Sequence, residues 1–119
     1  MSTDAAIEQE IQDKGLTAPR VTPADIEDEI VAVSYFTAAD GERGARNAQY
    51  ADDPVSPPCL ELLTFCVLVL RNGFTVTGES ACASPENFNQ DIGRKIARAN
   101  ATAKIWPLLG FRLRDKLAN

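Results

Sequence analysis

The alternation of apolar and polar residues is clearest in the second half of the chain. Residues 62–70 are rich in β-branched and other apolar side chains, and residues 74–79 return to the same pattern after Asn72-Gly73. Asn-Gly is the strongest two-residue signal for a β-hairpin, because both positions tolerate a positive φ. We therefore predict two antiparallel strands joined by a type I′ turn, with Val69 opposite Val76.

The predicted register separates two faces of the hairpin. One face is apolar and is expected to form the core; it carries Phe65, Val67, Val69, Phe74 and Val76. The other face mixes apolar side chains with hydroxyl and acidic ones; it carries Cys66, Leu68, Leu70, Thr75, Thr77 and Glu79. A mixed face suits neither bulk water nor a dry core. We expect it to meet another element, another subunit or a ligand.

Two helices are predicted from start signals that contain proline. Thr22-Pro23-Ala24-Asp25 has the residues of a capping box and predicts a helix that runs to about Val33. Ser84-Pro85 starts a second helix, in which Ile92 and Ile96 lie on one apolar stripe.

The second predicted helix reaches Trp106, just before Pro107. At about 1.5 Å per residue it would span roughly 30 Å, so part of it is expected to pack against a neighbouring chain. Residues 108–117 fit either a short strand or a second helical piece after a kink at the proline.

The remaining segments carry weaker patterns. Residues 1–21 are acidic and are expected to form a short helix or to be partly disordered. Residues 34–59 are rich in turn formers without a period, which predicts a loop insertion. The fold class that follows is α+β. It is one small oligomeric domain, residues 22–119, with an N-terminal helix, an antiparallel β-hairpin and a long C-terminal helix that Pro107 can kink.

The amino-acid composition limits the kinds of catalytic and metal sites that the protein can form. The 119 residues include no histidine, which removes the commonest general base, the usual nucleophile pairs and most zinc sites. We therefore expect a binding protein rather than an enzyme, with no metal and no cofactor. The acids of residues 25–29 are interpreted as a solvated helix face. Three cysteines are expected to be reduced, because the chain lacks a secretory signal and an apolar run of membrane-spanning length, which predicts a cytosolic protein.

The charges are segregated along the chain. Residues 1–62 hold 13 acidic and 4 basic residues, a net charge of −9, whereas residues 63–119 hold 4 and 8, a net charge of +4. A modest basic surface suits a phosphate-bearing ligand or an acidic partner. It falls short of a DNA-binding surface, so no DNA binding is expected.

The second half of the chain also resembles a known family. The matching residues are Asn72-Gly73-Phe74, Val76, Gly78-Glu79-Ser80-Ala81-Cys82, Pro85-Glu86-Asn87-Phe88, Gly93-Arg94-Lys95-Ile96-Ala97, Asn100-Ala101, Lys104-Ile105-Trp106 and Gly110-Phe111. This stretch resembles small phage accessory proteins of the lambdoid gene-66/gene-49 type. Some relatives are anti-CBASS sponges, oligomeric proteins that sequester the cyclic oligonucleotide messengers of bacterial antiphage defence without degrading them.

The resemblance implies a function and a set of binding residues. The ligand would be a cyclic di- or trinucleotide, bound in the host cytoplasm by a homo-oligomer such as a hexamer. The sponges stack a base on an aromatic residue that precedes the hairpin and contact phosphate from the strand after the turn. The candidate ligand-binding residues here are Tyr35, Gly73, Phe74, Thr75, Thr77, Arg94, Arg98 and Arg114.

One departure from the sponges concerns the strand after the turn. The sponges place a lysine near this strand, and residues 74–77 contain none. Either Arg71, Arg94 or Arg98 substitutes for it, or this branch has lost or changed its ligand. The alternative function is a protein-interaction module that inhibits a host factor through the acidic N-terminal half and residues 34–59.

Overall fold

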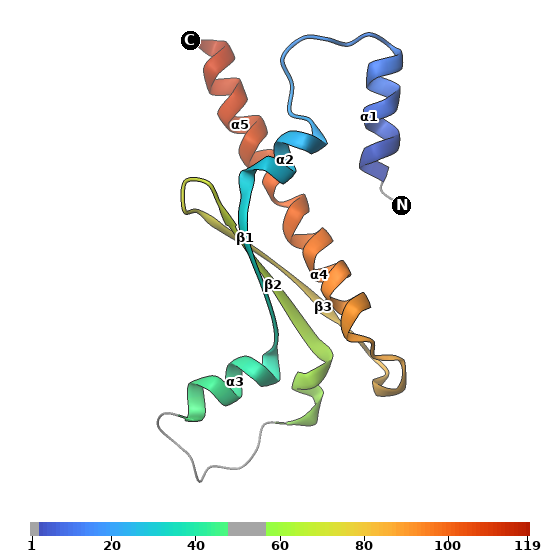
Figure 1. Ribbon diagram of the computed structural model, residues 1–119, viewed down its shortest axis with the longest axis vertical. Coiled ribbons are helices and arrows are strands. Elements are labelled where there is room, and N and C mark those ends of the chain that lie inside the picture. Colours follow the sequence, from blue (N-terminus) through green and yellow to red (C-terminus); the bar gives the residue numbers. More distant parts are fainter. Residues whose placement is uncertain (1–2, 48–56) are drawn as a thin grey trace.

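The computed structural model describes residues 3–47 and 57–119, and within these residues the fold is α+β, as predicted. The helices and strands are, in chain order, α1 (Thr3–Asp13), α2 (Pro23–Glu29), β1 (Ile30–Thr37), α3 (Ala38–Asn47), β2 (Leu63–Leu70), β3 (Thr75–Ala81), α4 (Gln90–Ala103) and α5 (Ile105–Ala118), with short 3₁₀ helices at Pro58–Leu62 and Pro85–Asn87. The strands form an antiparallel sheet in the order β1-β2-β3, and α4 and α5 run past it as one long bent rod (Figure 1).

The hairpin of β2 and β3 is confirmed, but its loop is one residue longer than predicted. The Gly73 amide donates to the Leu70 carbonyl at 2.9 Å, and the Leu70 amide donates to the Phe74 carbonyl at 2.8 Å. Gly73 has a φ of 89°, whereas no described residue other than glycine has a positive φ, which excludes a type I′ turn at Asn72-Gly73. The pattern is that of a type I turn closed by a left-handed glycine, and it pairs Val69 with Thr75 instead of Val76.

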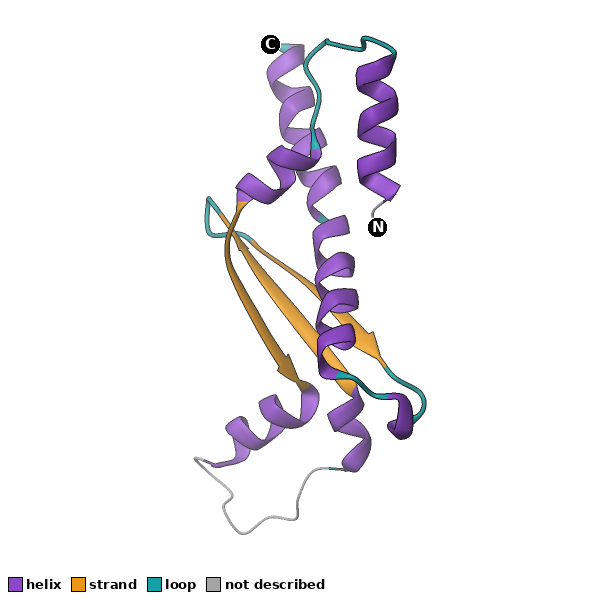
Figure 2. Cartoon of the chain, turned by 45° about the vertical axis from the view of Figure 1, so that its right-hand side comes forward, coloured by secondary structure: helices purple, strands orange, loops and turns teal. Residues whose placement is uncertain are grey.

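A slip of one residue places each β3 side chain on the opposite face relative to its predicted β2 partners. Cys66 and Leu68, predicted on the mixed face, are fully buried, and they share the core face with Val76, which was predicted to be in the core and is 8% exposed. The face that carries Phe65 and Val67 is only half-buried, and the prediction that it forms the core is wrong. The core face meets another element, α4, which lies across β2 and β3 (Figure 2).

The helix α4 approaches the sheet through small residues. These residues are Gly93, Ala97 and Ala101, and all three are buried. A Cβ built on Gly78 of β3 would lie 2.3 Å from the Ala97 carbonyl oxygen, so the helix backbone rests directly on the strand. Ile92 and Ile96 are 57% and 47% exposed. The apolar stripe predicted from these two isoleucines is therefore not the buried face of α4.

The first predicted helix is shorter than expected, and a strand follows it. The capping box is confirmed, because the Thr22 hydroxyl accepts from the Asp25 amide while the Asp25 carboxylate accepts from the Thr22 amide. The helix ends at Glu29, and residues 30–37 pair with β2 as an edge strand. A helix extending to Val33 is therefore wrong: pairing with a neighbouring strand outweighs the weak helical spacing of a short apolar run.

The loop insertion predicted for residues 34–59 is also wrong over most of its length. Residues 34–37 complete β1, and α3 begins directly afterwards. A second capping box starts α3, since the Thr37 hydroxyl accepts from the Asp40 amide at 3.1 Å and the Asp40 carboxylate accepts from the Thr37 amide at 3.0 Å. Residues 48–56 of the predicted insertion lie outside the described residues.

The C-terminal rod bends at Lys104 and continues as a helix. Residues 108–117 belong to α5, which decides between the strand and the helix that the sequence left open. Pro107 lacks the N–H that would bond to the Ala103 carbonyl, so the hydrogen-bond ladder of α4 stops there and a new first turn begins. The start of α4 also differs from the prediction, because its cap is Asn89, whose side chain accepts from the Ile92 amide at 3.0 Å.

The molecule is elongated. Its extents are 61, 33 and 17 Å and its radius of gyration is 18.5 Å, whereas a compact domain of this length would have a radius of gyration of about 13–14 Å. Figure 1 shows the cause, because α5 projects beyond the sheet at one end and α3 projects at the other. Among the described helices, none combines the length and the apolar character needed to cross a membrane.

Candidate ligand-binding site

Three of the predicted site residues come together between β1 and α4. The Arg94 guanidinium lies 5.5 Å from the centroid of the Tyr35 ring, a stacked cation–π contact. Arg98, one helical turn further along α4, lies near enough to the Tyr35 side chain that the tyrosine raises its pKa. We call these three residues the Tyr35 cluster.

The position of α4 explains why the Tyr35 cluster forms. The helix packs on β2 and β3, and β1 lies beside it at the edge of the sheet. Tyr35 pairs with Cys66 and so points to the same side of the sheet as the helix. The long arginine side chains of α4 span the remaining distance, and the Arg94 guanidinium lies over the tyrosine ring.

Glu27 of α2 places a negative charge beside the Tyr35 cluster. Its carboxylate accepts a hydrogen bond from Arg98 Nη2 at 3.0 Å. Partial burial works against the charge of Arg98, but Tyr35 and the Glu27 carboxylate outweigh it, and the pKa of Arg98 lies above its ordinary value. Arg98 is therefore a charged guanidinium that is held by Glu27 of α2 and lies beside Tyr35 of β1.

A hollow of 490 Å³, which we call the α4 pocket, adjoins the Tyr35 cluster and shares Arg98 with it. It lies between α1, α2 and α4, and its polar and aromatic lining residues are Asp4, Glu27, Lys95, Arg98, Thr102 and Trp106. Its volume falls within the range of small-molecule sites, about 300–1,000 Å³. Two cations, a hydroxyl and an indole ring can bind a phosphate and a flat ring, while the two carboxylates oppose an anion.

The other five predicted residues lie elsewhere. Thr75 and Thr77 point to the opposite face of the sheet from Tyr35, because their cross-strand partners are Val69 and Val67 rather than Cys66. Gly73 closes the hairpin loop.

The last two of these five predicted site residues are Phe74 and Arg114. Phe74 is 56% exposed and lines a separate hollow of 300 Å³ against Leu108 and Phe111 of α5. Arg114 is an exposed residue near the end of α5. Within this chain, the hairpin tip and the Tyr35 cluster are therefore different places.

The three arginines proposed to replace the missing lysine are also separated. Arg71 has a structural partner, since its Nε donates to the Asp28 carbonyl at 2.7 Å and its amide donates to the Glu29 carbonyl at 3.0 Å. These bonds tie the hairpin tip to the end of α2. Of the three, Arg94 and Arg98 are the ones placed beside an aromatic ring.

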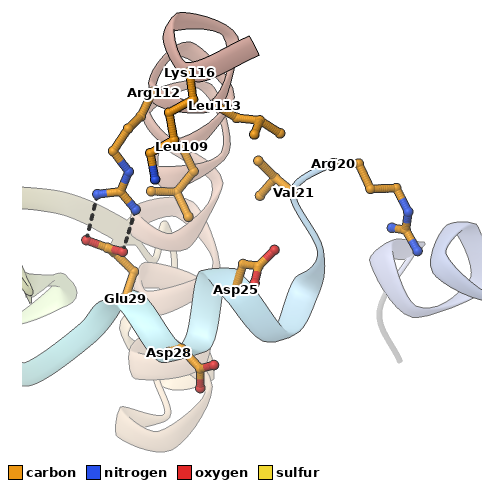
Figure 3. Close-up of a pocket in the computed structure, with 9 residues that line it drawn as sticks. All are labelled: Arg20, Val21, Asp25, Asp28, Glu29, Leu109, Arg112, Leu113 and Lys116. Carbon is orange, nitrogen blue, oxygen red and sulfur yellow. Dashed lines mark hydrogen bonds and ion pairs between the residues drawn. The ribbon is translucent and has the colours of Figure 1, made fainter. Parts of the chain in front are cut away.

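A second charged hollow, of 240 Å³, lies between α2 and α5 (Figure 3). Two of its charges are paired with each other: Arg112 Nη2 and Nη1 donate to the two oxygens of Glu29 at 2.8 and 3.3 Å. The Glu29 side chain is 7% exposed, and the Arg112 hydrogen bond holds its pKa below the ordinary value despite burial. This pair joins α2 to α5.

The sequence did not identify Lys95, Glu27 and Trp106 as neighbours of the site. The spacing of Lys95 to Thr102 and Trp106, seven and eleven residues, is the one sequence signal that would place all three on one side of a continuous helix. Glu27 carried no such signal, because its approach to Arg98 depends on how α2 packs.

The comparison with protein families gives a match that includes the residues on which the resemblance rests. Residues 21–117 match the family model described as phage protein (N4 Gp49/phage Sf6 gene 66). The match contains the Tyr35 cluster and excludes α1. No curated protein and no solved structure matches the chain.

Proposed function

Because the chain belongs to the phage protein (N4 Gp49/phage Sf6 gene 66) family, we propose that it sequesters cyclic oligonucleotide second messengers. By holding these messengers in the host cytoplasm, it would block a CBASS-type defence. The protein acts stoichiometrically and leaves the ligand intact. This activity needs a binding pocket and an excess of protein over messenger, and it needs no catalytic group.

The observation that supports this proposal is the Tyr35 cluster beside the α4 pocket. A cyclic oligonucleotide offers phosphates joined to flat bases. Guanidinium groups bind phosphate with two parallel hydrogen bonds, and aromatic rings and guanidinium planes stack on bases. Arg94, Arg98 and Tyr35 supply these groups within one small region.

Calorimetric titration with a panel of cyclic di- and trinucleotides tests the proposal. Binding of at least one of them is expected, with intact ligand recovered after the complex is heated. Arg98→Gln and Arg94→Gln should each weaken binding about tenfold or more, because a charge-assisted hydrogen bond is lost. Arg43→Gln is the matched control, since Arg43 is a half-exposed residue of α3 that pairs with Asp40. Absence of binding to every member of the panel would refute the proposal.

The proposed protein is a homo-oligomer. Large apolar side chains remain exposed at both ends of the sheet and along the rod; they include Phe36, Phe74, Ile92, Ile96, Phe111 and Leu117. A second chain that covers some of them would bury apolar surface that one chain leaves in water. Light scattering coupled to size exclusion should give a mass that is a multiple of 12.9 kDa. A mass of one chain at micromolar concentration would argue against it.

The hollow at the hairpin tip favours the alternative, a protein-interaction module. Phe74 and Phe111 are 56% and 75% exposed on either side of it, and aromatic residues of this kind are typical anchors of protein interfaces. A host protein captured by the wild-type chain after nuclease treatment, and lost on Phe111→Ser, would support this function. Capture that does not depend on Phe111 would count against this surface.

A further inference from the structure

The helix α1 is an addition to the domain and is loosely attached to it. The family match begins at residue 21, after α1 and its linker have ended. None of the residues of α1 is buried. A bidentate ion pair ties it to the linker: Arg20 Nη1 and Nη2 donate to the two oxygens of Glu8 at 2.6 and 2.7 Å. Both side chains of this pair are partly shielded, at 28% and 18% exposure.

This loosely held helix covers the α4 pocket. Its first turn supplies Asp4 and Ala5 to the pocket wall, on the side of Lys95 and Arg98. Further along, Ile7 and Ile11 line a neighbouring hollow of 240 Å³ together with Trp106. Figures 1 and 2 both show α1 beside the rod of α4 and α5, with its N-terminal end directed toward α4.

The charge of α1 opposes the ligand proposed for the pocket. Residues 3–13 contain four carboxylates and no basic residue. An acidic helix beside Lys95 and Arg98 is attracted to them, and it repels a phosphate that approaches the same cations. The docked helix and an anionic ligand therefore compete for one surface.

We propose that α1 is an acidic strap that occupies the cationic side of the α4 pocket and is displaced when a phosphate-bearing ligand binds. The proposal rests on the function proposed above for the ligand class, and it adds regulation of that site. The displaced state is reachable because α1 buries no residue of its own. The apparent affinity for the ligand then depends on the fraction of molecules whose strap is open.

The strap can be opened without shortening the chain. Arg20→Gln removes the bidentate pair and keeps all four carboxylates of α1, while Glu8→Gln breaks the same pair from the other side. Lys14→Gln is the matched control, because its ion pair with Glu10, at 2.8 Å, lies within the exposed end of α1 and does not join it to the domain.

The docking of the strap has a readout that needs no ligand. Trp106 is the only tryptophan of the chain, and it lines a hollow together with Ile7 and Ile11 of α1. Quenching of its fluorescence by acrylamide should rise by about half or more in Arg20→Gln and Glu8→Gln, since an opened helix exposes the indole. It should stay at the wild-type value in Lys14→Gln. Unchanged quenching in both strap variants would overturn the docking.

The competition is measured by calorimetry with two probes, 3′,3′-cyclic GMP–AMP and inorganic pyrophosphate. Arg20→Gln should bind at least one probe about fivefold or more tightly than the wild type, with Lys14→Gln unchanged. Tighter binding of pyrophosphate without binding of the cyclic dinucleotide would support the strap and count against the proposed ligand. Weaker binding by Arg20→Gln would show that α1 helps to hold the ligand. No binding of either probe by the opened variants would likewise overturn the strap.

Discussion

The contact of α4 with the sheet and the contact of α1 with α4 represent two extremes of packing in one small chain. At the first, a glycine and two alanines bring helix and strand backbones together, and a single added carbon has no room. At the second, no residue of the helix is buried and one ion pair holds it to the linker. The difference separates a part of the molecule that must be rigid from a part that can respond to a ligand.

Disrupting the close contact between β3 and α4 should have the largest effect on the free energy of unfolding. In Gly78→Ala the new methyl group would lie 2.3 Å from the Ala101 amide nitrogen and from the Ala97 carbonyl oxygen. Because backbone atoms cannot move aside cheaply, the free energy of unfolding should fall by about 3 kcal/mol or more. Urea denaturation followed by circular dichroism measures this. Gly44→Ala, where nothing lies within 4 Å in α3, should be neutral or stabilising, and equal losses in both variants would contradict the close approach.

Breaking the Glu29–Arg112 ion pair, which joins α2 to α5, should have an intermediate effect on stability. Arg112→Gln leaves a carboxylate that is 7% exposed without its cation, and should lower the stability by about 1–2 kcal/mol at pH 7. Arg114→Gln, two residues further along α5 and exposed, should cost much less.

The pH dependence of stability sharpens this prediction. The pKa of Glu29 is depressed in the folded state by Arg112, so its stabilising contribution is present above the ordinary value of 4.5 and is lost as pH falls through the folded value. The difference between wild type and Arg112→Gln should therefore shrink in denaturation series run from pH 7 down below pH 4.5. A difference that does not depend on pH would contradict the ion pair as the cause.

A substitution in the hairpin loop should have a smaller effect on the free energy of unfolding. The loop sets the register of β2 and β3, and this register places Gly78 under α4. Gly73→Ala puts a side chain on a residue with a φ of 89°, which should cost about 1 kcal/mol. Gly110→Ala, in open space on α5, should instead gain a few tenths to about 1 kcal/mol from helix propensity. Thermal unfolding of the two variants side by side tests the contrast, and a stabilised Gly73→Ala would contradict the left-handed turn.

Opening the strap should have the smallest effect on folding. Arg20→Gln is expected to leave the unfolding midpoint unchanged, because α1 buries no residue. The hydrogen bonds from Arg20 and Gln12 lower the pKa of Glu8 to about 2, well below its ordinary 4.5. The contribution of the pair to the docking of α1 is thus present above pH 4.5 and is lost only as pH approaches 2. Acrylamide quenching of Trp106 should stay constant between pH 7 and pH 4.5, and an increase within that range would contradict the ion pair.

The sequence located the hairpin, but the register predicted from it was wrong by one residue. Asn72-Gly73 satisfies a two-residue type I′ loop, and it also satisfies a three-residue loop in which only the glycine is left-handed. The choice depends on which face of β2 can be covered, and α4 covers the face of Cys66 and Leu68. Likewise, the isoleucines of α4 indicated the wrong buried stripe, because close approach to Gly78 required small residues there.

For the candidate site, the sequence by itself determined which side chains were available. The resemblance named Tyr35, Arg94 and Arg98, and their chemistry suits phosphates and bases. Only the tertiary structure decided that these three meet and that Phe74, Thr75 and Thr77 do not share their surface. The physical reason is that local spacing fixes the face of an element, whereas the packing of α4 on β2 and β3, beside an uncovered β1, fixes which faces meet. The same packing left a pocket for α1 to cover.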